Sequence, residues 1–208
     1  MQNSQAKQVL ARNGKSFYWA SLFLGPELAD RAARLYQFCR FVDDLADGDL
    51  PHRLDSLEDI RAGLTDPQYP AVATIPELDA FAALASEANI PLEAAGELLD
   101  GMLRDQHPTA LKSEAELLRY CHAVAGTVGL MMCRVLNCQH ARADAFAIDL
   151  GVAMQLTNIA RDVLEDAKMD RRYLPASWFA VSISPADIAH ASNDTHIPVA
   201  AAINQLLE

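Results

Sequence analysis

Apolar residues recur every three or four positions along almost the whole sequence, and this periodicity constrains the fold more than any other feature. It is the spacing of α-helices that bury one face. The alternation of β-branched residues that marks a half-buried strand is absent. We therefore predict an all-α chain. The expected helices span about residues 5–23, 26–46, 53–64, 76–88, 91–106, 113–136 and 143–168, followed by a loop and weaker helical pieces up to VAAAINQLLE, 199–208.

The composition favours one globular domain. The chain has 208 residues, half of them hydrophobic, which is ample for a sizeable core. Its formal net charge of −11 argues against a nucleic-acid partner, because binding phosphates requires a basic face. The four cysteines, at 39, 121, 133 and 138, form no Cys-x-x-Cys pair and are expected to be small buried hydrophobes in a reducing compartment. With no signal-peptide pattern and no membrane-spanning run, we expect a cytoplasmic protein.

The stretch FCRFVDDLAD, 38–47, ends an apolar helix in carboxylates. On a helix, Asp43 and Asp47 share one face with Arg40, whereas Asp44 points about a quarter-turn away. Two carboxylates at this spacing repel each other, and a divalent cation would remove that penalty. Taken alone, a solvated helix end is the simpler interpretation.

A second stretch, QLTNIARDVLED at 155–166, strengthens the metal interpretation. Gln155, Asn158, Asp162 and Asp166 lie on one stripe of a helix whose other faces are apolar. Polar groups at such positions must find partners, and a cavity holding metal, water and phosphate would supply them. Two Asp-x-x-x-Asp stripes on separate helices can face each other and hold metal ions that bridge to a diphosphate, with Arg161 within reach of the anion.

These residues belong to six segments that occur in the order typical of the squalene/phytoene synthase family, and the chain resembles that family from about Ser16 to Phe179. The segments are SFYWA (16–20), LYQFCRFVDDLAD (35–47), LLDGMLRD (98–105), YCHAVAGTVGLM (120–131), QLTNIARDVLED (155–166) and DRRYLP (170–175). QLTNIARD and RRYLPASW are most similar to the bacterial phytoene synthases.

The resemblance implies an all-α isoprenoid-synthase bundle around a central cavity, with residues 1–208 forming a single domain. In the family, the aspartates of both stripes bind Mg²⁺, with Mn²⁺ as the alternative ion, and substrate diphosphates. By position, the metal-binding roles fall to Asp43, Asp47, Asn158, Asp162 and Asp166. Diphosphate and substrate contacts fall to Arg40, Ser16, Tyr36, Tyr120, Gln155, Asn158, Arg161, Arg172 and Tyr173.

The implied reaction condenses two geranylgeranyl diphosphates head to head into phytoene, in carotenoid biosynthesis. Metal and arginine neutralise the leaving diphosphate, so that ionisation yields an allylic cation. Attack by the second double bond gives a cyclopropyl-carbinyl (prephytoene) diphosphate, which ionises again, rearranges and loses a proton. Carbocations must be kept dry, and VAGTVGLMM, 124–132, is the candidate apolar wall. Gly126 and Gly129 in it would allow close helix packing or a local kink.

Two alternatives stay open. The same fold could make squalene or dehydrosqualene from farnesyl diphosphate, and cavity depth, which helix spacing cannot measure, would separate these substrates. The chain could also be a catalytically inactive helical binding or assembly subunit.

Family members continue beyond the length of this chain, so we expect the C-terminal helices that complete the bundle to be missing, with apolar surface left exposed. The expected partner is an isoprenoid diphosphate. Peripheral membrane contact is expected only from the lipid nature of the product, and the sequence leaves the oligomeric state open.

Overall fold

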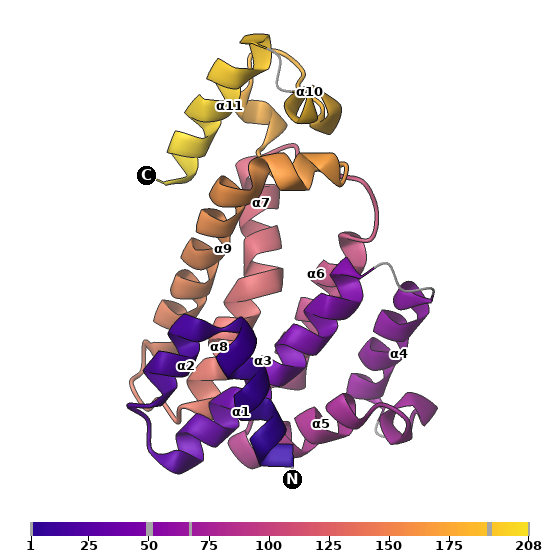
Figure 1. Ribbon diagram of the computed structural model, residues 1–208, viewed down its shortest axis with the longest axis vertical. Coiled ribbons are helices and arrows are strands. Elements are labelled where there is room, and N and C mark those ends of the chain that lie inside the picture. Colours follow the sequence, from indigo (N-terminus) through magenta and orange to yellow (C-terminus); the bar gives the residue numbers. More distant parts are fainter. Residues whose placement is uncertain (1, 49–51, 67, 191–192, 208) are drawn as a thin grey trace.

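The structure, a computed structural model, describes residues 2–48, 52–66, 68–190 and 193–207 (Figure 1). It confirms the all-α prediction. The helices are α1 (Gln2–Asn13), α2 (Lys15–Ser21), α3 (Pro26–Asp47), α4 (Arg53–Thr65), α5 (Pro76–Ala88), α6 (Leu92–Arg104), α7 (Glu114–Cys121), α8 (Thr127–Val135), α9 (Ala143–Lys168), α10 (Pro185–Ala189) and α11 (Asn193–Leu206). Shorter elements are the 3-10 turns Pro70–Ala73 and Ala176–Trp178, the π-helical turn η2 (His122–Gly126), and the strands β1 (Thr109–Ala110) and β2 (Arg171–Arg172).

The prediction of a single helix over residues 5–23 is wrong, because Gly14 separates α1 from α2. A Cβ atom at this position would lie 2.9 Å from the ring of Tyr36. Glycine therefore lets the chain turn closely over α3, and it also weakens the continuous helix that periodicity suggested.

The sequence contains no strand signal, but the structure has one short pair of strands. β1 pairs with β2 in parallel, with Thr109 opposite Arg171 and Ala110 opposite Arg172. Two residues are too few for an alternating pattern to be visible in a sequence. The pairing nevertheless matters, because it ties the loop after α6 to the loop after α9.

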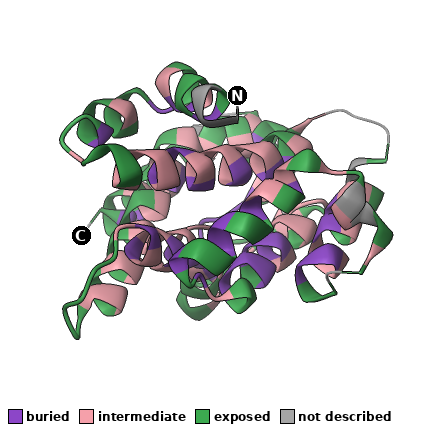
Figure 2. Cartoon of the chain, turned by 90° about the horizontal axis from the view of Figure 1, so that it is seen from below, coloured by how far each residue is buried: buried purple, intermediate pink, exposed green. Residues whose placement is uncertain are grey.

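Two apolar clusters hold the bundle together, with buried residues on the inward faces of the helices (Figure 2). The larger cluster joins α3, α4, α5, α6 and α8, and at its centre the rings of Phe38 and Phe81 stack at 3.9 Å. The second joins α7, α9, α11 and the segment directly after β2, through residues such as Leu117, Ile159 and Leu206. α10 and α11 lie at one end of the long axis, and α1, α2 and α5 lie toward the other (Figure 1).

The helices α8 and α9 cross at very short range through two glycines. A Cβ at Gly129 would lie 2.1 Å from the carbonyl oxygen of Ala147, and one at Gly151 would lie 2.3 Å from that of Ala125. The helix expected over 113–136 contains the π-helical turn η2, which ends at Gly126. Close packing and a local irregularity therefore occur together in this segment.

The cysteines are free thiols in the described residues, and one prediction about them is wrong. Cys121 and Cys133 are buried and Cys39 is half-buried, but Cys138 is exposed because it follows the end of α8. Burial raises the pKa of the Cys39 and Cys121 thiols to about 12, so both stay protonated at neutral pH.

Some apolar surface is exposed, as expected from the sequence. On α9, Phe146, Leu150 and Met154 recur every four residues and are exposed. In the described parts of the chain, no helix has both the length and the apolar character needed to cross a bilayer.

Candidate active site

A cavity of about 570 Å³ lies between the inward faces of α3, α6, α7 and α9 and the segment around β2. Polar and charged residues dominate its lining. They are Arg40, Asp43, Asp47, Asp105, Tyr120, Gln155, Asn158, Arg161, Asp162, Glu165, Asp166, Arg171 and Tyr173. The remainder of the lining is apolar: Ala46, Met102, Val124, Ile159 and Met169.

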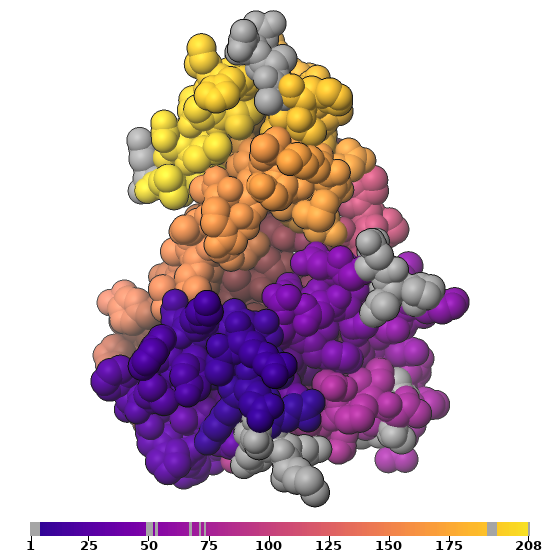
Figure 3. Space-filling view, viewed as in Figure 1, coloured from indigo at the N-terminus to yellow at the C-terminus, as the bar shows by residue number. Residues whose placement is uncertain are grey.

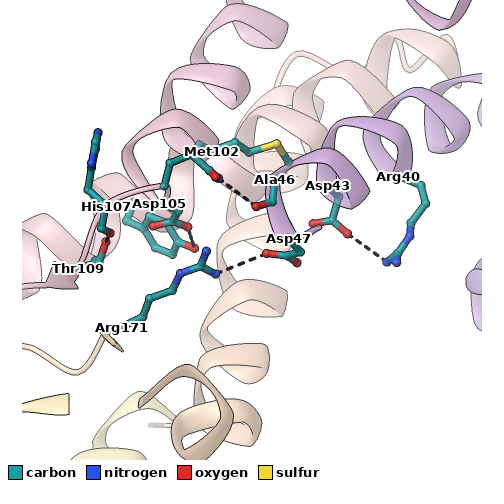
Figure 4. A network of polar contacts seen from close by, with 11 residues as sticks. Arg40, Asp43, Ala46, Asp47, Met102, Asp105, His107, Thr109 and Arg171 are labelled. Carbon is teal, nitrogen blue, oxygen red and sulfur yellow. Dashed lines mark hydrogen bonds and ion pairs between the residues drawn. The ribbon is translucent and has the colours of Figure 1, made fainter. Parts of the chain in front are cut away.

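The last two turns of α3 form the first wall. Arg40 Nη1 donates to Asp43 Oδ2 at 3.0 Å (Figure 4). Its other terminal nitrogen pairs with Asp44. Asp44 itself is exposed and does not line the cavity, as the helical geometry predicted. Burial, followed by repulsion from Asp47, raises the pKa of Asp43 to about 6, although Arg40 opposes the shift.

The stripe on α9 forms the facing wall. Asn158 Nδ2 donates to Gln155 Oε1 at 3.4 Å, and Arg161 Nε donates to Asp162 Oδ1 at 2.7 Å. This bond lowers the pKa of Asp162. Asp166 behaves in the opposite way, because burial and the nearby Asp162 raise its pKa to about 7. The two Asp-x-x-x-Asp stripes therefore do meet at one cavity.

A third wall comes from residues that the sequence did not single out as a group. Tyr120 on α7 donates its hydroxyl to Asp105 Oδ2 at 2.7 Å, and its ring stacks on Tyr173 at 4.6 Å. Burial raises the pKa of Asp105, opposed by hydrogen bonds from both tyrosines. Asp105 ends the motif LLDGMLRD, but nothing local marks it as a site residue, since its partners are distant in sequence.

Arg171, also missed, joins the third wall to the first. Its Nη1 lies 3.4 Å from Asp47 Oδ1, and it lines the cavity (Figure 4). The resemblance assigned a substrate contact to the neighbouring Arg172, but Arg172 is buried and donates to the carbonyl oxygen of Leu174 at 2.6 Å. Successive residues of a strand point to opposite sides, so only one of the two arginines on β2 can reach the cavity.

Ten of the thirteen predicted site residues line the cavity, and three do not. Besides Arg172, these are Ser16, which is exposed on α2, and Tyr36, which packs against α1 and Phe17 with ring centroids 6.3 Å apart. Tyr36 lies one helical turn before Arg40 on α3, and the chain turn at Gly14 covers it. Both residues were assigned by resemblance, and in this chain neither side chain lines the cavity.

The donor set suits Mg²⁺ or Mn²⁺. Carboxylate and amide oxygens from opposite walls are the ligands these ions prefer. Burial, followed by repulsion from neighbouring carboxylates, raises the pKa of Asp43 and of Asp166, so the ionised, metal-free cavity is disfavoured. Among the described residues, no three His, Cys, Asp or Glu side chains already converge on one point. An ion held here would therefore complete its shell with water or ligand oxygens.

Fold and site together define a class: a helical bundle with an acidic, arginine-edged cavity between two Asp-x-x-x-Asp stripes. Comparison with known proteins is consistent with this. The sequence profile described as squalene/phytoene synthase matches residues 10–208. The chain belongs to the squalene/phytoene synthase family.

Two relatives and one solved structure illustrate the similarity. A phytoene synthase from Pseudescherichia vulneris is 36% identical over 200 residues, which cover 90% of this chain and 64% of its own. A phytoene synthase from Thermus thermophilus is 41% identical over 169 residues, covering 81% and 57%. The crystal structure of a dehydrosqualene synthase in complex with ligand matches with a TM-score of 0.77 at 28% identity, covering 98% of this chain and 72% of that one. The chain thus spans about 57–64% of the length of these two relatives.

Proposed function

We propose that this cavity binds isoprenoid diphosphates together with Mg²⁺. We further propose that the protein is a prenyltransferase that joins two geranylgeranyl diphosphates head to head, through prephytoene diphosphate, to phytoene. One observation carries the proposal. Two stripes that are more than a hundred residues apart in sequence, ending in Asp47 and Asp166, line the same cavity. Repelling carboxylates placed opposite one another suit a role in which cations lie between them.

The arginines supply the complementary charge. Arg40, Arg161 and Arg171 line the cavity, one from each of three different elements. Guanidinium groups bind phosphate oxygens in a bidentate manner, so these three would orient a diphosphate and stabilise the charge that develops as it leaves. A bound Mg²⁺ would supply Lewis-acid stabilisation of the same oxygens.

The other lining residues suit a carbocation. Tyr120 stays protonated, because burial and the adjacent Asp105 raise its pKa well above the usual range. It therefore presents an uncharged ring, stacked on Tyr173, whose face can stabilise a nearby cation. Met102, Val124 and other apolar residues of the lining would limit the access of water.

Substrate length is the finer part of the proposal. The two relatives described above are named phytoene synthases, which favours the C20 substrate. The name of the structural neighbour, a dehydrosqualene synthase, keeps farnesyl diphosphate as the second candidate. A non-catalytic binding subunit would retain diphosphate binding without product.

The test is incubation of the protein with Mg²⁺ and either geranylgeranyl or farnesyl diphosphate, followed by product analysis. We expect phytoene from the C20 substrate, and at least a hundredfold less product after Asp43→Asn or Asp162→Asn with unchanged helical content. Dehydrosqualene from the C15 substrate alone would reassign the substrate. Binding without any product from either substrate would support the non-catalytic alternative.

A further inference from the structure

The turn that joins α8 to α9 brings two of the four cysteines together. At the end of α8, Cys138 N donates to Cys133 O at 3.1 Å. Asn137, which adopts the left-handed conformation with φ 52°, donates its N–H to Arg134 O at 3.0 Å. This pair of bonds is the Schellman motif of a helix C-terminus, in which the side chains of the residues joined by the outer bond come into contact. Here both of those residues are cysteines.

The backbone geometry holds the two thiols within bonding range. With standard bond lengths, the 3.1 Å bond between Cys133 and Cys138 keeps their Cα atoms within about 7 Å of each other. A disulfide joins Cα atoms that are roughly 4.4–6.8 Å apart. The thiols interact directly, since Cys138 is among the groups that raise the pKa of the Cys133 thiol. No other cysteine of the described chain affects the thiol pKa of Cys39 or Cys121.

The two thiols differ in their access to solvent. Cys138 is exposed, and the turn between α8 and α9 reaches the surface of the molecule (Figure 3). Cys133 is only 4% exposed, and burial raises its pKa to about 11, so its thiol stays protonated at neutral pH. An exposed thiol next to a second cysteine is the arrangement of a redox-sensing cysteine and its resolving partner.

We propose that Cys138 and Cys133 form a reversible disulfide when hydrogen peroxide reaches the protein. The Cys138 thiolate attacks the peroxide, so that an S–O bond forms, the O–O bond breaks and hydroxide leaves. The Cys133 sulfur then attacks the sulfenic acid. The S–S bond forms, the S–O bond breaks, and the thiol proton leaves with the hydroxyl group as water. A dithiol reductant reverses the reaction by exchange.

The disulfide would stabilise the connection between α8 and α9. Arg134, next to Cys133, already pairs with Asp144 in the first turn of α9 at 2.6 Å. A bond that closes residues 133–138 into a loop restricts the unfolded chain, so the oxidised protein should have a Tm higher by about 3 °C or more. Neither cysteine lines the candidate active site, and the proposal therefore stands without the proposed catalysis.

A soft metal ion is the other ligand that two neighbouring thiols could take. Structural zinc sites use four protein ligands. Within the described ranges of the chain, no third His, Cys, Asp or Glu side chain converges with this pair on one point. The nearby carboxylate of Asp144 is engaged by two hydrogen bonds from Arg134. The geometry therefore favours a disulfide.

Counting thiols tests the proposal. The full chain is reduced, freed of reductant, treated with a small excess of hydrogen peroxide, and then denatured for titration. We expect the count to fall from four to two without dimers in non-reducing electrophoresis, and to return to four with dithiothreitol. Trypsin cuts after Arg134, so a disulfide keeps peptides 120–134 and 135–142 together. Fragment masses then distinguish Cys133 from Cys121, which lies in the same peptide.

Three variants assign the chemistry to this pair. Cys138→Ser removes the exposed thiol, so peroxide should change neither its thiol count nor its Tm. Cys133→Ala keeps the exposed thiol but removes its partner, so dimedone, which reacts with sulfenic acids, should label Cys138 at least tenfold more than in the parent. The matched control is Cys39→Ala on α3, which should still lose two thiols.

Several results would overturn the proposal. They are a thiol count that peroxide leaves unchanged, a disulfide between two chains or to Cys39 or Cys121, and a loss of two thiols that persists in Cys138→Ser. Dimedone labelling of the parent as strong as that of Cys133→Ala would show that the sulfenic acid is not resolved. An oxidised parent that melts no higher than the reduced one would contradict the stabilising role.

Discussion

Replacing Asp43 by Asn should stabilise the metal-free protein. The pKa of Asp43 is raised from 3.8 to about 6, so the folded state binds its proton more tightly than the unfolded chain does. The stability contributed by this group is therefore present below about pH 4 and is lost as the pH rises through 6. At neutral pH the ionised carboxylate destabilises the fold, and the neutral amide does not.

The size of the expected stabilisation follows from the pKa shift of Asp43 and from the exposed fraction of its side chain. About two pKa units correspond to roughly 3 kcal/mol at full effect. The side chain is 45% exposed, so solvent screening reduces this figure. We expect about 1 kcal/mol, or an increase of about 2–4 °C in Tm for a chain of this size. Arg40 does not lose its only partner in the variant, because it also pairs with Asp44.

The assay is urea denaturation followed by circular dichroism at pH 7.5 and at pH 4, with and without Mg²⁺. Without metal, the Asp43→Asn variant should be more stable than the parent at pH 7.5 but not at pH 4. Mg²⁺ should stabilise the parent and have much less effect on the variant. The control is Asp44→Asn, outside the cavity, which should keep the full response to Mg²⁺. A metal-free variant that is less stable than the parent at pH 7.5 would refute the reasoning.

Three further substitutions test the packing and the walls of the cavity. Gly151→Ala should lower the free energy of unfolding in urea by about 1–3 kcal/mol, because its Cβ would meet a backbone carbonyl oxygen at 2.3 Å. The control Gly25→Ala, with no atom within 4 Å of its Cβ, should be neutral. Equal stabilities of the two variants would contradict the close helix crossing. Arg171→Gln should weaken diphosphate binding in calorimetry about tenfold or more, with little change in stability. Arg172→Gln, at a buried position, should instead reduce stability. The reverse result would show that the two arginines are misassigned. Tyr120→Phe leaves the half-buried carboxylate of Asp105, directly after α6, short of one donor and should cost about 1–2 kcal/mol. An unchanged denaturation midpoint would mean that this hydrogen bond contributes nothing.

Long elements with clear ends could be predicted from the sequence. The helix α9 begins and ends at the expected residues, because 26 residues of unbroken periodicity leave no other choice. The break at Gly14 could not be predicted, since a single glycine is often tolerated within a helix. Gly14 also lies against the ring of Tyr36 on another helix, a tertiary contact that the sequence does not reveal.

The candidate site likewise has features that local spacing predicts and features that depend on tertiary contacts. Spacing placed Asp43 and Asp47 on one face, and Asp162 and Asp166 on another, because helical geometry relates residues four apart. The third wall depends on contacts between separate segments, such as the hydrogen bond of Tyr120 on α7 to Asp105, directly after α6. No local pattern reports such contacts. Arg172 was predicted as the site residue in place of Arg171, because the orientation of both side chains is set by a two-residue strand that pairs with a segment about sixty residues away.

The most direct test of the central claim, that the two stripes form one metal–diphosphate site, is calorimetry with inorganic pyrophosphate and Mg²⁺. We predict that the parent binds pyrophosphate only when Mg²⁺ is present. Asp47→Asn on α3 and Asp162→Asn on α9 should each weaken binding at least tenfold, and the double variant should lose less than the product of the two effects. Binding that is independent of Mg²⁺, or that survives either substitution unchanged, would contradict a shared site.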